Sequence, residues 1–261
     1  MAPRLSAVSL AVAVTAVLVA PELVPTDPLR QSLADALSPP SLDAPFGRDH
    51  LGRCVATRLV YGARLSLAIG LGATLSAVAI GVSLGLASAR LGGVVDAVID
   101  RAIDIAYGFP GLLLVMVLAT LFGSGPVGLT AALTLAAWPD YARLTRLLGR
   151  AQLARAHVEA ARLMALPELV VLYRHVWPGL APQIASLASF GVGQAILTIS
   201  ALGFLGLGLR PPTPEWGAMV AEGLSHWHEA PWMLVAPVTA IALTVLGLQA
   251  VAGRRRALDG G

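Results

Sequence analysis

The sequence predicts an all-α polytopic membrane protein with six transmembrane helices and a cytoplasmic two-helix loop. Composition is the first observation behind this prediction. The 261 residues are 56% hydrophobic and only 13% charged, with a mean hydropathy of +0.76, whereas soluble domains are about one-quarter charged. The second observation is that several apolar runs approach or exceed the roughly 20 residues with which a helix crosses a bilayer.

The apolar runs place the helices in order along the chain. The turn "GSGPVG" between the third and fourth runs is short, so these two helices are expected to be antiparallel neighbours. The first run follows Arg4 and has only about sixteen apolar residues, so a cleaved signal peptide is the alternative there, although Pro21 argues against cleavage. The expected helices lie at 5–20, 66–89, 105–122, 127–138, 184–208 and 232–252.

Arginine placement sets the expected orientation. Residues 139–183 hold six arginines and residues 254–256 are all arginine, whereas the segment between the last two helices holds only Arg210. By the positive-inside rule, the arginine-rich loop and both termini are cytoplasmic. The predicted organisation is a first transmembrane helix at 1–20, an external loop with a short amphipathic helix at 21–65, a core of five transmembrane helices at 66–252 and a cytoplasmic tail at 253–261.

The external loop conflicts with the positive-inside rule. It carries several arginines, and acidic residues balance them only in part because acids count for little in this rule. The arginines concerned are Arg30, Arg48, Arg53, Arg58 and Arg64.

A polar loop at 151–180 interrupts the apolar pattern. Its first part, His157–Leu166, favours a helix. Pro167 ends that helix and suits the first position of a second one, which Pro178 and Gly179 then stop. Two short helices joined by a sharp elbow are therefore predicted. A helical hairpin lying on the membrane surface is the alternative.

Small and polar residues inside the apolar runs are the candidates for packing and for transport. Gly81 and Gly85 permit close helix approach, within this chain or to a like partner, and a lined solute path is the alternative. Polar groups are costly inside a membrane unless they face protein or water. The expected pathway-lining residues are therefore Gln194, Thr198 and Ser200.

Few residues suggest metal or redox chemistry. Cys54 is the single cysteine and cannot form an intrachain disulfide. His226 and His228 in "SHWHEA" are weak candidates for a transition metal, because histidines at i,i+2 share a face only in a strand. Solvated loop residues are the alternative, so no resident metal is predicted.

Two other classes of membrane protein fit the sequence less well. An ion-coupled secondary transporter could use Asp100, Asp104 and Asp140 as a proton relay, but all three lie near expected cytosolic ends, where charge is cheap. An intramembrane hydrolase would need a nucleophile and a base at depth, and no histidine falls within an expected helix.

The polar loop contains the run "EAARLMALPELVVLYRHVWPGLAP". Its Glu159-Ala160-Ala161 and His175-Val176-Trp177-Pro178 resemble the EAA loop of ABC-type permease subunits, E-A-A-x-x-x-G followed by I-x-L-P or H-x-x-P. The usual glycine falls at Ala165, which implies that Pro167 makes the bend or that the elbow is tighter. The ATPase-coupling residues that the resemblance implies are Arg155, Glu159, Ala160, Ala161, Arg162, Ala165 and Pro167.

Two further stretches narrow this resemblance. "FGRDHLGRCVATRLVYGARLSLAIG" at 46–70 and "SALGFLGLGLRPPTPEWGAMVAEG" at 200–223 resemble patterns of the C-type permeases of the dipeptide/oligopeptide/nickel group, and "APWMLVAP" precedes the last helix as expected. The matches cover roughly residues 46–248 in order. The tail "VAGRRRALDGG" departs from the family pattern.

The resemblance implies a permease subunit of an ATP-binding-cassette importer in a bacterial inner membrane, carrying di- or oligopeptides or nickel and metal chelates. The implied partners are a second permease, two cytoplasmic ATPases, an external solute-binding protein and membrane lipid, without nucleic acid. The sequence has no lysine and hence no Gly-x-x-x-x-Gly-Lys-Ser/Thr loop. We therefore expect no enzyme activity and no cofactor in this chain, with ATP and Mg²⁺ on partner subunits.

Overall fold

The computed structural model describes residues 27–123 and 125–259, the stretch 251–259 through its backbone alone. The helix predicted at 5–20, and the signal peptide that is its alternative, lie outside the described residues. Within the described residues, the secondary structure is helical and no strand occurs beyond an isolated bridge between Arg48 and Cys54. The all-α prediction is confirmed.

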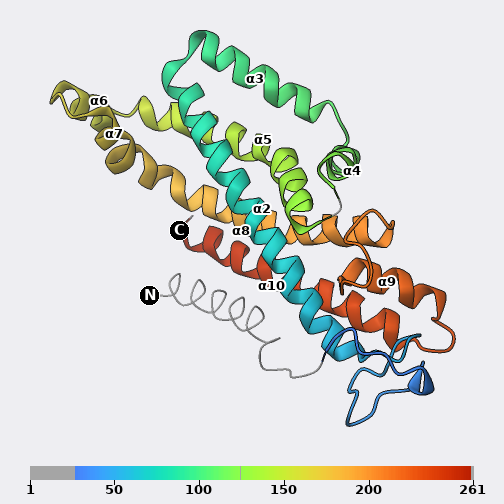
Figure 1. The fold of residues 1–261 in the computed structure, drawn as a ribbon. Helices are drawn as coiled ribbons and strands as arrows, with labels where there is room; N and C mark the ends of the chain where they lie inside the picture. The colour runs from blue at the N-terminus through green and yellow to red at the C-terminus, as the bar shows by residue number, and fades with distance from the viewer. Residues whose placement is uncertain (1–26, 124, 260–261) are drawn as a thin grey trace.

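The long helix α2 (Val55–Leu91) contacts α3, α5, α8, α9 and α10, whereas α4 packs on α5 (Figure 1). In the loop 27–54, the only helix is the three-residue η1, in place of the predicted amphipathic helix. The elements are the 3₁₀ turn η1 (Leu33–Asp35), α2 (Val55–Leu91), α3 (Gly93–Tyr107), α4 (Gly111–Phe122), α5 (Pro126–Leu153), α6 (Ala156–Leu163), α7 (Glu168–Val171), the π-helical turn η2 (Leu172–Val176), α8 (Trp177–Phe204), α9 (Trp216–Ser225) and α10 (Trp232–Asp259).

Two glycines let α2 and α5 pack backbone to backbone. A Cβ atom on Gly81 would lie 2.6 Å from the carbonyl oxygen of Trp138, and one on Gly85 would lie 2.6 Å from that of Ala142. No side chain fits at these two positions, because real Cβ atoms do not approach backbone so closely. The close-approach interpretation is confirmed, and the partner helix belongs to the same chain.

The third predicted helix, 105–122, is wrong as a single straight element. The chain instead forms α3 and α4, which are bent by 95° relative to each other. The bend falls at Gly108–Pro110, where Pro110 cannot donate an N–H group to the preceding turn and disfavours a helical conformation for Phe109. The segment is therefore a bent pair whose first half, α3, is amphipathic.

The fourth predicted helix, 127–138, ends much too early. α5 continues through Pro139 to Leu153, although its second half carries Arg146 and Arg150. These arginines pair with carboxylates of α3: Arg146 Nε lies 2.6 Å from Asp96, and Arg150 Nη2 lies 2.5 Å from the same residue. Hydropathy therefore missed a helical extension that contacts between α3 and α5 stabilise.

The predicted stop at Pro178 and Gly179 is also wrong. α7, η2 and α8 together make one helical stretch of 37 residues, Glu168–Phe204. The wider π-helical turn Leu172–Val176 lies immediately before Pro178, where a proline ring in a regular helix would clash with the carbonyl group four residues back. The second helix of the polar loop is thus the beginning of the next membrane helix.

The described residues contain three helices long and apolar enough to cross a membrane, or four if the bent pair α3 and α4 counts as one span. α5 is long but does not meet this measure. A polytopic membrane fold is therefore confirmed in its coarse form, while the count of six spans stays a prediction. The three helices are Val55–Leu91, Glu168–Phe204 and Trp232–Ala250.

The two ends of the bundle differ in character. α6 and α7 project at one end, and α9 with the loop 27–54 lies at the other (Figure 1). Val158, Val171 and Leu180 are fully buried in the core beneath the elbow, and Trp216 is buried among α2, α8 and α10 at the α9 end.

Candidate functional site

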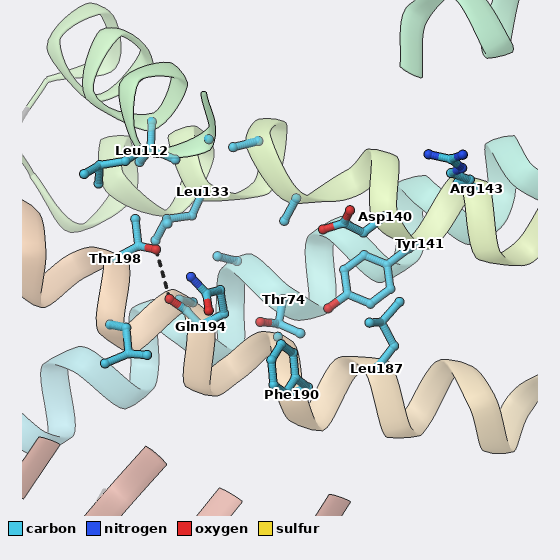
Figure 2. Close-up of a pocket in the computed structure, with 18 of the residues that line it drawn as sticks. Thr74, Leu112, Leu133, Asp140, Tyr141, Arg143, Leu187, Phe190, Gln194 and Thr198 are labelled. Atoms are coloured by element: carbon cyan, nitrogen blue, oxygen red, sulfur yellow. Dashed lines mark hydrogen bonds between the residues drawn. The ribbon is translucent and has the colours of Figure 1, made fainter. Parts of the chain in front are cut away.

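A cavity of about 840 Å³ lies among α2, α3, α4, α5 and α8 (Figure 2). Much of its wall is apolar, formed by side chains such as Leu112, Leu133, Leu187 and Phe190. Polar groups enter it from four of the helices and are few enough to be distinctive. They are Thr74, Tyr107, Asp140, Tyr141, Arg143, Gln194 and Thr198.

Two of the three predicted pathway residues line this cavity. Gln194 and Thr198 lie one turn apart on α8, and the Thr198 hydroxyl donates to the backbone carbonyl of Gln194 at 2.9 Å. That bond satisfies the hydroxyl hydrogen inside an apolar helix, and the amide of Gln194 keeps its hydrogen-bonding capacity toward the cavity (Figure 2).

The third predicted residue, Ser200, lies away from the cavity and beside α9. Its backbone carbonyl packs against Gly217, where no Cβ atom would fit. Glu215 caps α9 there, accepting the N–H groups of Gly217 at 2.8 Å and Ala218 at 2.9 Å. Burial raises the pKa of the Glu215 carboxyl, and those two N–H groups oppose the rise.

Three side chains at one side of the cavity join α3 to α5. The Tyr107 hydroxyl donates to a carboxylate oxygen of Asp140 at 2.7 Å. The guanidinium carbon of Arg143 lies 5.6 Å from the centre of the Tyr107 ring, within the range of a cation–π contact. Sequence reasoning noted Asp140 alone. It missed Tyr107 because the contact joins residues 33 positions apart and no local pattern encodes it.

The elbow of the polar loop is a Schellman motif. The N–H of Leu166 donates to the carbonyl of Ala161, and the N–H of Ala165 donates to that of Arg162 at 2.9 Å. Ala165 therefore occupies the position just beyond the helix end where glycine is usual, and its φ is +55°. Alanine makes the bend in a left-handed conformation, and Pro167 follows as the residue before α7 rather than as its first residue.

The predicted coupling residues lie on and around α6. All of them are exposed except Ala161, which is buried against the core of the elbow. Arg162 donates to Glu168 at 2.8 Å, and Arg90 at the end of α2 lies 3.2 Å from the same carboxylate oxygen, so ion pairs hold the elbow against α2. The exposed members are Arg155, Glu159, Ala160, Arg162, Ala165 and Pro167.

Large apolar side chains surround the exposed polar ones at the elbow. Leu163 is 83% exposed and Met164 is 74% exposed at the end of α6, and Leu169 and Tyr173 are similarly exposed beyond the bend. Such a concentration of exposed apolar area is typical of a protein-binding surface. Sequence reasoning did not select these four residues as a binding surface, because an apolar face of a helix is usually expected to be buried.

A buried ion-pair network fastens the loop 27–54 to α9. Asp49 lies 2.6 Å from Arg53 and 2.7 Å from Arg58, and Glu222 of α9 lies 2.6 Å from Arg58 and 3.2 Å from Arg53. Both arginines and Asp49 are almost fully buried. Two positive and two negative charges balance within the network, which limits the cost of burying them.

The histidines predicted as weak metal ligands do not meet in one site. His226 stacks on His50 with ring centres 5.2 Å apart, whereas His228 accepts a hydrogen bond from the neighbouring Trp227. Asp49, His50 and Glu222 do bring possible ligand atoms within 4.8 Å of one another. Their carboxylates already accept guanidinium N–H groups, so a divalent cation would have to compete with two buried arginines.

Comparison with known proteins identifies a family and several relatives. Residues 77–257 match the family model of the binding-protein-dependent transport system inner membrane component. The glutathione transport system permease protein GsiD of Shigella dysenteriae serotype 1 (strain Sd197) is 40% identical over 221 residues, which cover 84% of this chain and 73% of the relative. The same-named protein of Pectobacterium atrosepticum is 37% identical over 215 residues, covering 82% and 71%.

The family match begins within α2 and spans the other cavity helices, the elbow and α9. Members of this family are membrane permeases of ABC transporters and not enzymes, and they reside in bacterial inner membranes. The chain belongs to the binding-protein-dependent transport system inner membrane components and is a permease subunit of an ABC importer.

Proposed function

We propose that this chain and a second permease subunit together enclose a pathway for small peptides, and that the cavity in Figure 2 is this chain's share of it. The main observation behind this proposal is the cavity itself, which has a size typical of small-molecule sites. Its wall is largely apolar, with a few polar groups from four helices. The names of its relatives refer to glutathione, a tripeptide, which favours peptides over nickel or other metal chelates.

Two cytoplasmic ATPases, which hold ATP and Mg²⁺, drive this pathway in our proposal. Their docking surface is the elbow: the exposed polar residues around Glu159, with Leu163, Met164, Leu169 and Tyr173 supplying apolar contact. The unbroken helical stretch Glu168–Phe204 supports this role, because it runs from the elbow into the cavity wall and carries Gln194 and Thr198.

The proposed topology has six spans, with both termini and the elbow in the cytoplasm and the α9 end outside. Solute then arrives at the α9 end from an external binding protein. The ion-pair network supports this orientation, because Arg53 and Arg58 are neutralised by Asp49 and Glu222 and no longer count as free positive charges in an external loop.

The ion-coupled alternative finds less support in the contacts. Asp100 is an ion-pair partner of Arg146, and Asp104 is exposed near Arg101 at 3.8 Å. Asp140 accepts a hydrogen bond from Tyr107. These three carboxylates do not form a chain through which a proton could pass, and each has a local structural partner.

Reconstitution tests the proposed function directly. The chain is co-purified with its second permease, ATPases and binding protein, and peptide uptake into proteoliposomes is measured with and without ATP. We expect uptake only with ATP and all partners present. Gln194→Leu should lower the uptake rate while leaving expression and assembly unchanged; uptake that is independent of ATP but follows an ion gradient would contradict the proposal.

A charge reversal tests the elbow separately. Glu159→Lys should lower solute-stimulated ATPase activity, because it places a positive charge in the exposed surface of α6 without touching the buried core of the elbow. Asp104→Lys is the matched control, since Asp104 is also exposed but lies on α3. Equal effects of the two variants, or unchanged stimulation in Glu159→Lys with intact assembly, would remove Glu159 from the docking surface.

A further inference from the structure

We infer that Asp140 and Arg143 recognise the ammonium and the carboxylate of a zwitterionic short peptide inside the cavity. This inference rests on the proposed transport function and assigns the solute a chemical class. It starts from the charges on α5, which fall into two groups with different surroundings.

The first group lies beyond the cavity and is paired. Arg146 forms ion pairs with Asp96 and Asp100, and Arg150 forms one with Asp96. These contacts join α5 to α3 and account for every charge that the two arginines bring. They are structural, because none of the four residues lines the cavity.

The second group lines the cavity and lacks an ion-pair partner among the described residues. Asp140 accepts a hydrogen bond from the neutral Tyr107 hydroxyl, and Arg143 stacks over the same ring. One carboxylate oxygen of Asp140 is thereby held while the other stays available. The guanidinium of Arg143 also interacts with the Tyr107 hydroxyl, and its remaining N–H groups stay available. A negative and a positive group thus border a cavity whose wall is largely apolar (Figure 2).

Spacing defines what such a pair can bind. Residues three apart on a helix have Cβ atoms about 5–6 Å apart. Asp140 and Arg143 therefore face a solute whose ammonium and carboxylate lie close together, as in a dipeptide or at an α-amino-acid end group. The apolar wall around Leu133, Leu187 and Phe190 accommodates the rest of the solute. Tyr107 is a positioning residue, since it holds both charged side chains.

Occupancy of the cavity can be measured without ATP hydrolysis. Cys54 is the single cysteine, so the double variant Cys54→Ser, Ala137→Cys carries one thiol in this chain, at a position lining the cavity. The full importer is reconstituted in proteoliposomes, and maleimide labelling at that position is followed by mass spectrometry. The probes are dialanine, N-acetyl-dialanine and dialanine amide.

Dialanine is expected to slow the labelling. In this background, Arg143→Gln should raise the dialanine concentration for half-protection about tenfold, or ~1.4 kcal/mol, and leave that of dialanine amide unchanged. Asp140→Asn should do the same for dialanine and leave N-acetyl-dialanine unchanged. Arg101→Gln and Asp104→Asn, which remove the same charges from exposed positions on α3, should change nothing.

Two results with the unmodified cavity charges would overturn the inference: no protection by dialanine, or equal protection by all three probes. A third is that the variants weaken protection by all probes equally, which would show that Asp140 and Arg143 have only a structural role. ATP-dependent uptake in the same proteoliposomes separates this outcome from failure of the proposed function. Protection with the expected charge dependence but no ATP-driven uptake would support the charge pair and contradict the import role.

Discussion

Replacing Ala165 by glycine should stabilise the elbow. The φ of Ala165 is +55°, and a left-handed conformation costs an L-residue roughly 1–2 kcal/mol. Glycine avoids that cost but loses an extra 0.5–1 kcal/mol or so of backbone entropy on folding. Because the Ala165 side chain is exposed, little packing is lost. The net gain is about 0.5–1 kcal/mol for closing the Schellman motif.

Hydrogen exchange of the elbow measures this gain. The amides of Ala165 and Leu166 donate the two hydrogen bonds that close the motif, so their exchange should slow about two- to fivefold in Ala165→Gly. Ala160→Gly is the control with the opposite sign: it places the same substitution inside α6, where glycine costs about 1 kcal/mol. Unchanged or faster exchange in Ala165→Gly would refute the strain on which the reasoning depends.

Three further predictions concern stability. Gly85→Val should abolish stable folding, because its Cβ atom would meet the α5 backbone at 2.6 Å, whereas Gly111→Ala, which has open space, should be tolerated; thermal melting of the purified variants compares them. Arg58→Leu should cost about 3–5 kcal/mol by leaving buried carboxylates short of a partner, seen as a lower denaturation midpoint. The raised pKa of Glu215 means that the folded state holds this proton more tightly, so stability should fall as pH rises above 4.5, the ordinary value of this group. Glu215→Gln should flatten that part of the melting profile, and an unchanged slope would contradict the assignment.

The sequence predicted those helices that can be recognised from their own apolar residues. α2, α8 and α10 were found because each contains a long run without charge. It failed where another element changed the balance. The charged half of α5 is helical because α3 supplies Asp96 to its arginines, and hydropathy along one segment contains no such information.

The effects of two prolines on helix continuity were predicted wrongly, in opposite ways. Pro178 was expected to stop a helix, but the π-helical turn before it accommodates the ring and the helix continues. Pro110 was not expected to break one, yet the chain turns sharply there. The effect of a proline depends on whether neighbouring turns can widen, which is set by packing and not by the proline itself.

The sequence predicted the polar residues that α8 contributes to the cavity, but it did not predict the contact of Tyr107 with Asp140 and Arg143. Gln194 and Thr198 stood out because polar groups are costly in an apolar run, and both line the cavity. Ser200 carried the same signal but serves the contact with α9. Polarity in a span shows that a group faces something other than lipid, and only the fold distinguishes a cavity from a neighbouring helix.

The length of the helical stretch Glu168–Phe204 also relates a movement of the elbow to the resulting movement of Gln194 in the cavity. Its 37 residues make a rod about 55 Å long. One end packs closely against α9, where Gly203 lies against Glu215 and Ser200 against Gly217. Gln194 lies about 15 Å from that end, so a rod pivoting there moves Gln194 by roughly a quarter of the displacement at the elbow. The displacement of Gln194 is thus smaller than that of the elbow, and the force at the cavity is correspondingly larger.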